Sequence, residues 1–151
     1  MLKLVKTNSE NKDFILLVKQ LDAYLKITDG DEHDFYNQFN TTNSIKHVVV
    51  AYINEEPIAC GAIKAFSKNK VEVKRMFSSK KARNKGIATK VLKALEDWAV
   101  ALNYKAVVLE TGIRQTEAVA FYKKNKYTSI PNYGQYIGVK NSLCFQKIIK
   151  E

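Results

Sequence analysis

Apolar side chains recur at helical spacing in two long stretches of the chain. The first stretch covers residues 13–26, and its apolar positions are Phe14, Leu17, Val18, Leu21 and Leu25. The second covers residues 87–102, with apolar side chains at Ile87, Val91, Leu95, Trp98 and Leu102. Because residues three or four apart share one helix face, each stretch predicts an amphipathic helix with one buried side. The pattern also predicts shorter helices over residues 116–124 and in the segment that ends near residue 40.

Alternating or continuous apolar runs predict the strands between these helices. The predicted strands cover residues 2–6, 47–53, 58–66, 71–78, 106–110 and 143–149. A turn at residues 54–57 joins the second and third of them in a hairpin. In the strand 71–78, strict alternation places Glu72 and Met76 on the same face. The predicted order, β-α-α-β-β-β-α-β-α-β, is that of a single α/β domain over residues 1–151 with a mixed sheet.

Length and composition are those of a soluble globular protein. The chain has 151 residues, of which 46% are hydrophobic and 26% charged, and this balance excludes a disordered or collagen-like chain. The longest apolar run, residues 48–53, is far shorter than the roughly 18 residues of a membrane span, and the first residues lack a signal-peptide core. Cys60 and Cys144 lie far apart without metal-ligand spacing. We therefore expect two buried free thiols, no metal site and a cytoplasmic protein.

The net charge of +10 predicts an anionic partner, which is a nucleic acid, a membrane surface or a polyphosphate cofactor. The basic residues gather in the loop 79–86, between the strand 71–78 and the long helix that follows. Gly86 stands at the start of that helix, where the first backbone N–H groups lack an intrahelical partner and a small residue lets an anion approach. The loop therefore predicts a phosphate-binding site, although it lacks the Gly-Lys-Ser/Thr element of a Walker loop.

Two motifs of the chain resemble those of the GNAT acetyltransferase superfamily. Residues 83–88, Arg-Asn-Lys-Gly-Ile-Ala, match the signature Arg/Gln-x-x-Gly-x-Gly/Ala, and residues 118–127 resemble the second motif, Ala-x-x-aromatic/Leu-Tyr-x-x-x-Gly-Phe/Tyr. Two places depart from the family: Gln115 stands where Asn is usual, and Asn125 and Lys126 occupy the position of the glycine. The resemblance implies a central, mostly antiparallel twisted sheet, a β-loop-α-β cradle and helices on both faces.

The resemblance implies acetyl-CoA as the co-substrate. The pyrophosphate would lie on the backbone of residues 83–89 and the pantetheine arm along residues 76–78, with a backbone N–H near Met76 polarising the thioester carbonyl. The parallel strands 72–78 and 106–110 would separate to admit the arm. The cofactor-binding residues implied in this way are Met76, Phe77, Ser78, Arg83, Asn84, Lys85, Gly86, Ile87, Ala88, Thr89 and Gln115.

Acetyl transfer to an amine needs a group that takes a proton, because deprotonating an ammonium of pKa about 10.4 at pH 7 costs about 4–5 kcal/mol. Some family members carry a catalytic glutamate at the spacing of Glu72, so the resemblance implies that Glu72 is the base and acts through a water. The structural alternative is a glutamate paired with Lys74. Glu110, at the end of the next strand, competes for the role, and solvent is a third option. Tyr122 matches the family's general acid, the alternative being a tyrosine packed in the core.

Two further segments are candidates for recognition of the acceptor. Residues 29–34 are dense in acidic side chains, which predicts an exposed loop, with binding of a cationic amine as the functional alternative. His33 is expected to be exposed. The loop that carries Tyr133, Gln135 and Tyr136 would form an aromatic wall beside the acceptor or cap the sheet.

Taken together, the resemblance implies an N-acetyltransferase for a primary amine of a small molecule or a protein. A non-catalytic acyl-CoA-binding regulatory module is the alternative, and the presence of both Glu72 and Tyr122 argues against it. A nucleic-acid-binding domain is the third reading, which is disfavoured because the lysines outside the basic loop are scattered over solvent-facing helix positions. We expect no membrane partner, and the resemblance allows a homodimer.

Overall fold

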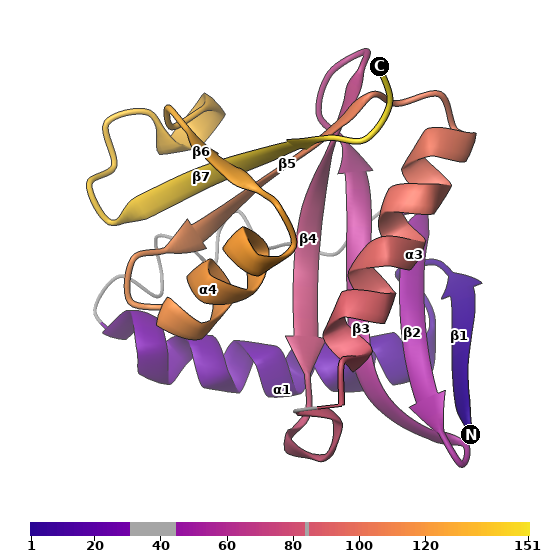
Figure 1. The fold of residues 1–151 in the computed structure, drawn as a ribbon. Helices are drawn as coiled ribbons and strands as arrows, with labels where there is room; N and C mark the ends of the chain where they lie inside the picture. The colour runs from indigo at the N-terminus through magenta and orange to yellow at the C-terminus, as the bar shows by residue number, and fades with distance from the viewer. Residues whose placement is uncertain (31–44, 84) are drawn as a thin grey trace.

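One seven-stranded sheet organises the protein (Figure 1). The computed structural model describes residues 1–30, 45–83 and 85–151. The strands are β1 (Leu2–Thr7), β2 (His47–Ile53), β3 (Glu56–Ala65), β4 (Lys70–Ser78), β5 (Ala106–Gly112), β6 (Thr128–Ile130) and β7 (Ser142–Ile148), in the sheet order β1-β2-β3-β4-β5-β7-β6. Neighbouring strands are antiparallel except β4 and β5, which are parallel.

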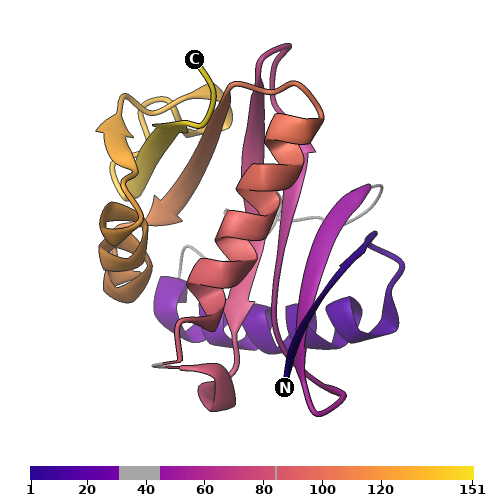
Figure 2. The same ribbon diagram turned by 45° about the vertical axis from the view of Figure 1, so that its right-hand side comes forward.

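Helices cover both faces of the sheet, as expected (Figures 1 and 2). Helix α1 (Lys12–Asp29) packs Phe14, Leu17 and Val18 against one face, in a cluster with residues of β2 and β3. Helix α3 (Ile87–Ala101) and helix α4 (Thr116–Lys124) contribute to the larger core cluster on the other face. Among the described residues, no helix combines the length and the apolar character that crossing a membrane requires.

Most predicted elements match the structure closely. The bounds predicted for β2 and α4 are those observed, and α1, α3 and β7 differ by three residues or fewer at each end. The short strand β6 was not predicted, and Pro57 lies within β3, beside a register shift, rather than in the turn. The predicted helix that ends near residue 40 lies outside the described residues. Cys60 and Cys144 are free and buried, as expected.

A β-bulge in β4 changes which side chains share a face. Ala62 of β3 pairs with Lys74 and Cys60 pairs with Phe77, so β4 has one extra residue over this stretch. The extra residue lies beside Arg75, whose φ of 58° is in the left-handed region. The guanidinium of Arg75 pairs with Asp22 of α1, which holds the bulged residue toward that helix.

The expected alternation through β4 is therefore wrong beyond the bulge. Met76 packs with Val73 against the α3 side of the sheet, and a side chain at Gly61 would collide with it. Phe77 packs on the α1 side. The prediction that Glu72 and Met76 share a face fails for this reason, because an inserted residue reverses the facing of every later side chain.

The parallel strands β4 and β5 pair only at one end. Their ladder runs from Lys70 opposite Ala106 to Glu72 opposite Val108, and beyond that point β4 and β5 no longer pair with each other. Beyond that point β5 diverges from β4 (Figure 1) and pairs with β7 on its other side. The expected separation of the two strands is confirmed, and it opens the sheet beside α4.

Candidate active site

The basic loop and the start of α3 form a backbone surface suited to an anion. The loop contains a short 3-10 turn, η2 (Lys80–Ala82), and Gly86 caps α3 with a φ of 69°. The first helical hydrogen bond is donated by the Lys90 N–H to the Gly86 carbonyl, so the N–H groups of Ile87, Ala88 and Thr89 have no intrahelical acceptor. Its two chain neighbours apart, no atom of the residues that the structure describes lies within 4 Å of the place where a side chain of Gly86 would begin. A phosphate can therefore approach these N–H groups directly.

A groove of about 590 Å³ runs from this helix start to the opening between β4 and β5. That volume lies within the range of small-molecule sites. Most of the predicted cofactor-binding residues line it, namely Met76, Phe77, Ser78, Arg83, Gly86, Ile87, Ala88, Thr89 and Gln115. Lys85 is not among the lining residues, and Asn84 lies outside the described residues. An elongated ligand with phosphate groups at one end fits this combination of length, basic charge and open N–H groups.

A smaller cavity of about 100 Å³ adjoins the groove between β4 and β5. Five residues line both spaces, which therefore meet at Leu21, Met76, Gln115, Ala118 and Tyr122. The small cavity is the polar end of the site: Asp29, Glu72, Lys74 and Glu110 all line it. A cavity of this volume has room for a few waters or a small polar group.

Tyr122 stands where the groove and the small cavity meet. Its side chain comes from α4, and only 6% of the residue is exposed. The ring makes edge contacts with Phe121 and Tyr127, at centroid distances of 5.1 and 5.6 Å. Burial raises the pKa of the Tyr122 hydroxyl above its ordinary value, so the group stays protonated across the physiological range. Tyr122 is thus a core residue that also lines both the groove and the small cavity.

Glu72 is held from two sides on the α1 face of β4. The Tyr133 hydroxyl donates a hydrogen bond of 2.6 Å to Oε2, and Lys74 Nζ lies 3.5 Å from Oε1. The residue is 8% exposed. The aromatic loop supplies the hydroxyl, and Tyr133 is itself packed against Phe66 and Tyr136 at 4.8 and 5.9 Å between ring centroids. Glu72 thus pairs with Lys74, as the structural alternative for this residue expected, and of the tyrosines in the aromatic loop Tyr136 lines the small cavity.

Glu110 lies on β5, across the opening from Lys74. Its Oε2 is buried, and no described residue hydrogen-bonds to that atom. The pKa of Glu110 is raised to about 7, chiefly because burial disfavours the charged form. The charges of Asp29 and Glu72 act in the same direction, whereas the Ser142 hydrogen bond and the charge of Lys74 oppose them. Glu110 is therefore a carboxyl group that gains and loses a proton near neutral pH.

Asp29 departs from the expectation of an exposed acidic loop. It is the last residue of α1, is 4% exposed and lines the small cavity. Gln115 Nε2 donates to Asp29 Oδ1 at 3.4 Å, and Arg114 Nη1 donates to the Asp29 carbonyl at 3.0 Å. Gln115 thus uses its amide within the protein while still lining the groove. The rest of the acidic segment, with His33, lies outside the described residues.

Sequence reasoning missed several residues of the site. Tyr24 and Lys124 line the groove, and Lys74, which was expected only as a partner of Glu72, lines the small cavity. The helical spacing of apolar residues in α1 predicts that Leu21 lies on the buried face with Leu25. Nothing in the local sequence indicates that Tyr24 lines a groove. Lys124, in the last turn of α4, is an exposed lysine like many others in the sequence.

Comparisons with known proteins find similar chains and folds. Residues 15–127 match the family model described as Acetyltransferase (GNAT) family. The chain is 29% identical to the IAA acetyltransferase of Azospirillum brasilense over 135 residues, which are 88% of each protein. A structure from Klebsiella pneumoniae subsp. pneumoniae, assigned as an acyl-CoA N-acyltransferase, matches with a TM-score of 0.83 and 25% identity, over 99% of this chain and 98% of that one. A GNAT family acetyltransferase from Elizabethkingia anophelis, solved with acetyl-CoA bound, matches with a TM-score of 0.70 and 18% identity over 97% of each chain.

Proposed function

The chain belongs to the acetyltransferase (GNAT) family, and we propose that it transfers the acetyl group of acetyl-CoA to a primary amine of a small molecule or a peptide. One observation carries the proposal. A long groove, which begins at open N–H groups and basic side chains, ends against a small acidic cavity, and Tyr122 lines both. Such a site has one compartment for a phosphate-bearing donor and another for an amine.

Acetyl-CoA supplies an activated acetyl thioester, and the groove residues have distinct roles toward it. Arg83 and the N–H groups that begin α3 would bind the pyrophosphate, where the helix dipole favours negative charge. Among the residues that the structure describes, no strand pairs with Met76 to Ser78 on the β5 side of β4, so this edge could pair with the pantetheine arm. Lys124 is a further cation for the phosphates.

The amine reaches the small cavity as an ammonium ion and has to lose a proton there. The carboxylates of Asp29, Glu72 and Glu110 line the cavity together with two cations, Lys74 and Arg75, and Arg75 is itself paired with Asp22 of α1, so the remaining negative charge favours entry of a cation. A carboxylate, directly or through one water, then removes the proton. Glu72 and Glu110 both line the cavity and are the candidates for this step.

Tyr122 is proposed to protonate the sulfur of the departing thiolate. Its hydroxyl is protonated at neutral pH. Tyr122 lies between the two compartments, where the acetyl group would pass from the sulfur of CoA to the nitrogen of the amine. Burial raises the proton affinity of a thiolate as well as that of a phenolate. Burial of the thiolate therefore offsets part of the rise in the pKa of Tyr122, and this favours transfer of the proton to sulfur.

Thermal unfolding with and without acetyl-CoA tests the proposal first, with CoA as a second ligand and ATP as a control. At about 100 times its dissociation constant a ligand adds about 2.7 kcal/mol to the free energy of unfolding. For a chain of this size that corresponds to a rise in Tm of about 5–10 °C. We expect the rise with acetyl-CoA and CoA and little change with ATP. The absence of a rise with acetyl-CoA would remove the proposed donor.

Thiol release then measures turnover with a panel of amines. We would use ethylamine, 1,4-diaminobutane, phenethylamine and the dipeptide Ala-Ala at saturating acetyl-CoA. Acceleration by any of these over the rate without amine supports acetyl transfer, and mass spectrometry of the product locates the acetyl group on nitrogen. A protein that binds acetyl-CoA but accelerates with none of the four would favour the non-catalytic binding module.

A further inference from the structure

Two glutamates from different strands lie on one face of the sheet beside the point where β4 and β5 part. Glu72 pairs with Val108 at the last position of the parallel ladder, and Glu110 comes two residues later on β5. Since side chains two residues apart share a face, Glu110 faces the same side as Val108 and Glu72. Both glutamates line the small cavity, so both can reach a group bound there.

The oxygens of Glu72 are already engaged by the protein. Oε2 accepts the hydrogen bond of 2.6 Å from the Tyr133 hydroxyl, and Oε1 faces Lys74 Nζ at 3.5 Å. A proton on this carboxylate would weaken both contacts, because a hydrogen bond or ion pair to a charged oxygen is stronger than a contact with a neutral one. Tyr133 and Lys74 therefore hold the Glu72 carboxylate in place in the wall of the cavity.

Glu110 has the opposite surroundings. Its Oε2 is buried and has no hydrogen-bond partner among the described residues, so a lone pair on that oxygen is available at the cavity. The charged and titratable groups that surround its carboxyl come from four elements: Asp29 of α1, Glu72 and Lys74 of β4, Tyr136 of the 3-10 turn η3 (Gly134–Tyr136), and Cys144 of β7. The two neighbouring carboxylates favour proton uptake by Glu110, and its pKa of about 7 is close to the ideal for a general base at neutral pH.

We propose that Glu110, on β5, accepts the proton of the acceptor's ammonium group, while the Glu72 carboxylate, held by Tyr133 and Lys74, positions that ammonium. This assignment rests on the proposed function. One N–H bond of the ammonium breaks and its proton passes to the Glu110 carboxylate. The neutral nitrogen then forms a bond to the acetyl carbon as the carbon–sulfur bond breaks. The sulfur leaves with the bonding electron pair and takes a proton from Tyr122, and the second proton of the nitrogen is lost to solvent.

The pH dependence of kcat/KM separates the two glutamates. With the best acceptor of the amine panel, the wild-type rate should rise with pH through a midpoint near 7, where Glu110 loses its proton. Glu110→Gln should lower kcat by about 100-fold or more, the usual contribution of a general base, and should abolish that rise. Glu72→Gln should keep the rise but move its midpoint to lower pH, because a negative charge beside Glu110 has gone. Glu10→Gln, a surface variant in the turn before α1, controls for the loss of a carboxylate.

Direct titration of the carboxyl groups gives a readout that needs no acceptor. In protein labelled with carbon-13 at the glutamate side-chain carboxyl, one resonance should titrate near pH 7 and be missing from Glu110→Gln. A Glu110 resonance that titrates below pH 5 would overturn the assignment, as would a Glu110→Gln enzyme that keeps both its pH profile and most of its turnover. Loss of the rise in Glu72→Gln instead would make Glu72 the base. These failures differ from failure of the proposed function, in which the wild-type protein acetylates none of the amines.

Discussion

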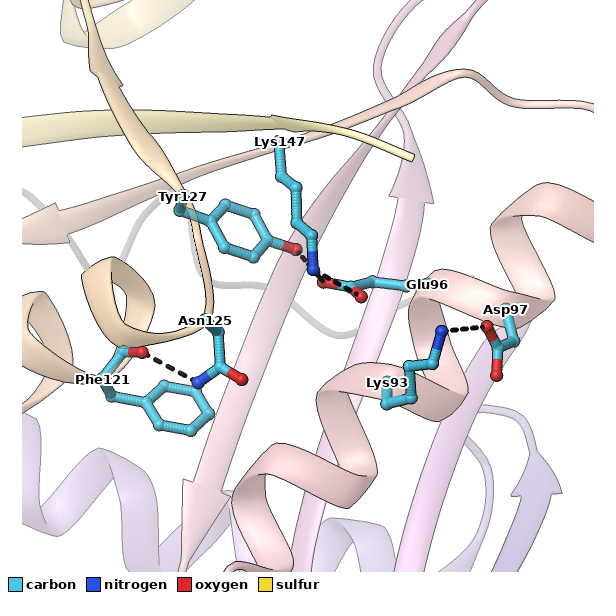
Figure 3. Close-up of polar contacts among 7 residues, drawn as sticks. All are labelled: Lys93, Glu96, Asp97, Phe121, Asn125, Tyr127 and Lys147. Carbon is cyan, nitrogen blue, oxygen red and sulfur yellow. Dashed lines mark hydrogen bonds and ion pairs between the residues drawn. The ribbon is translucent and has the colours of Figure 1, made fainter. Parts of the chain in front are cut away.

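Lys147 of β7 donates from Nζ to both carboxylate oxygens of Glu96 on α3, at 3.0 and 3.2 Å (Figure 3). Glu96 is 5% exposed and also accepts a hydrogen bond of 2.8 Å from the Tyr127 hydroxyl. Tyr127 in turn contacts the ring of Tyr122. The carboxylate therefore ties the strands beyond the opening to the long helix, and it supports the residue at the junction of the two binding spaces.

Replacing Lys147, the cation that contacts Glu96, should destabilise the fold. Lys147→Met leaves Glu96 buried with only the Tyr127 hydroxyl, and loss of a charged hydrogen bond costs about 1.5–3 kcal/mol. Urea denaturation should show that loss in the free energy of unfolding. Lys93→Met is the matched control, because it breaks the ion pair with Asp97 on the same helix, where both side chains are more than 60% exposed (Figure 3). It should leave the free energy of unfolding unchanged. Equal losses in the two variants would mean that the buried Glu96–Lys147 ion pair stabilises the fold no more than an exposed pair does.

Gly86→Glu should abolish the rise in Tm produced by CoA. The substitution puts a carboxylate and extra bulk where the first N–H groups of α3 face the groove. Gly138→Glu is the matched control, since Gly138 also has a positive φ and open space around it but does not line the groove. Both variants should lose some stability from the backbone strain of a side chain at positive φ. Binding of CoA to Gly86→Glu with unchanged affinity would place the phosphates elsewhere.

Tyr122→Phe should reduce kcat by about 100-fold, the contribution expected of a general acid. The packing of the ring against Phe121 and Tyr127 is kept, so stability and the Tm rise with acetyl-CoA should change little. Steady-state rates and thermal unfolding on the same preparation separate the two effects. Equal losses of turnover and of CoA binding would instead mean that the hydroxyl only maintains the shape of the groove.

Stability should fall between about pH 4.5 and 7 because of Glu110. Its pKa is raised from 4.5 to about 7 in the folded protein, so over this range the unfolded chain has released the proton that the folded chain still holds. Rising pH then favours the unfolded chain by up to about 3 kcal/mol from this group. Urea denaturation at pH 5 and pH 8 should show a smaller loss in Glu110→Gln than in the wild type. An identical pH dependence in both proteins would mean that Glu110 is ionised throughout.

Tyr133→Phe tests how the aromatic loop holds Glu72. The variant removes the hydrogen bond of 2.6 Å and leaves Glu72 with Lys74 alone, so we expect a loss of about 1–3 kcal/mol in stability. If Glu72 positions the ammonium, KM for the amine should rise more than kcat falls. The comparison variant is Tyr24→Phe, on the groove side, which should leave KM for the amine unchanged. A fall in kcat alone would point to a direct role of Tyr133 in proton transfer.

The elements of the fold were predictable because their signals are local. The helical spacing of α1 and α3 and the continuous apolar run of β5 lie within single segments, and so do the motifs at residues 83–88 and 118–127. Gly86 could be assigned to an anion site from its neighbours alone. The short strand β6 was not predicted because its residues, Thr128–Ile130, are too few and too exposed to show the alternation of apolar and polar residues typical of a strand.

The arrangement of the cavity was decided by contacts between distant segments. The bulge at Arg75, which reverses the facing of Met76, accompanies an ion pair with Asp22, 53 residues earlier. The exposed or buried state of Asp29 depends on where α1 ends relative to Gln115, 86 residues away. Glu72 and Glu110 face one cavity only because β4 and β5 part after one short ladder. Sequence patterns report which side of its own segment a residue occupies, whereas the proton affinity of a carboxyl group depends on burial and on charges that other segments bring to it.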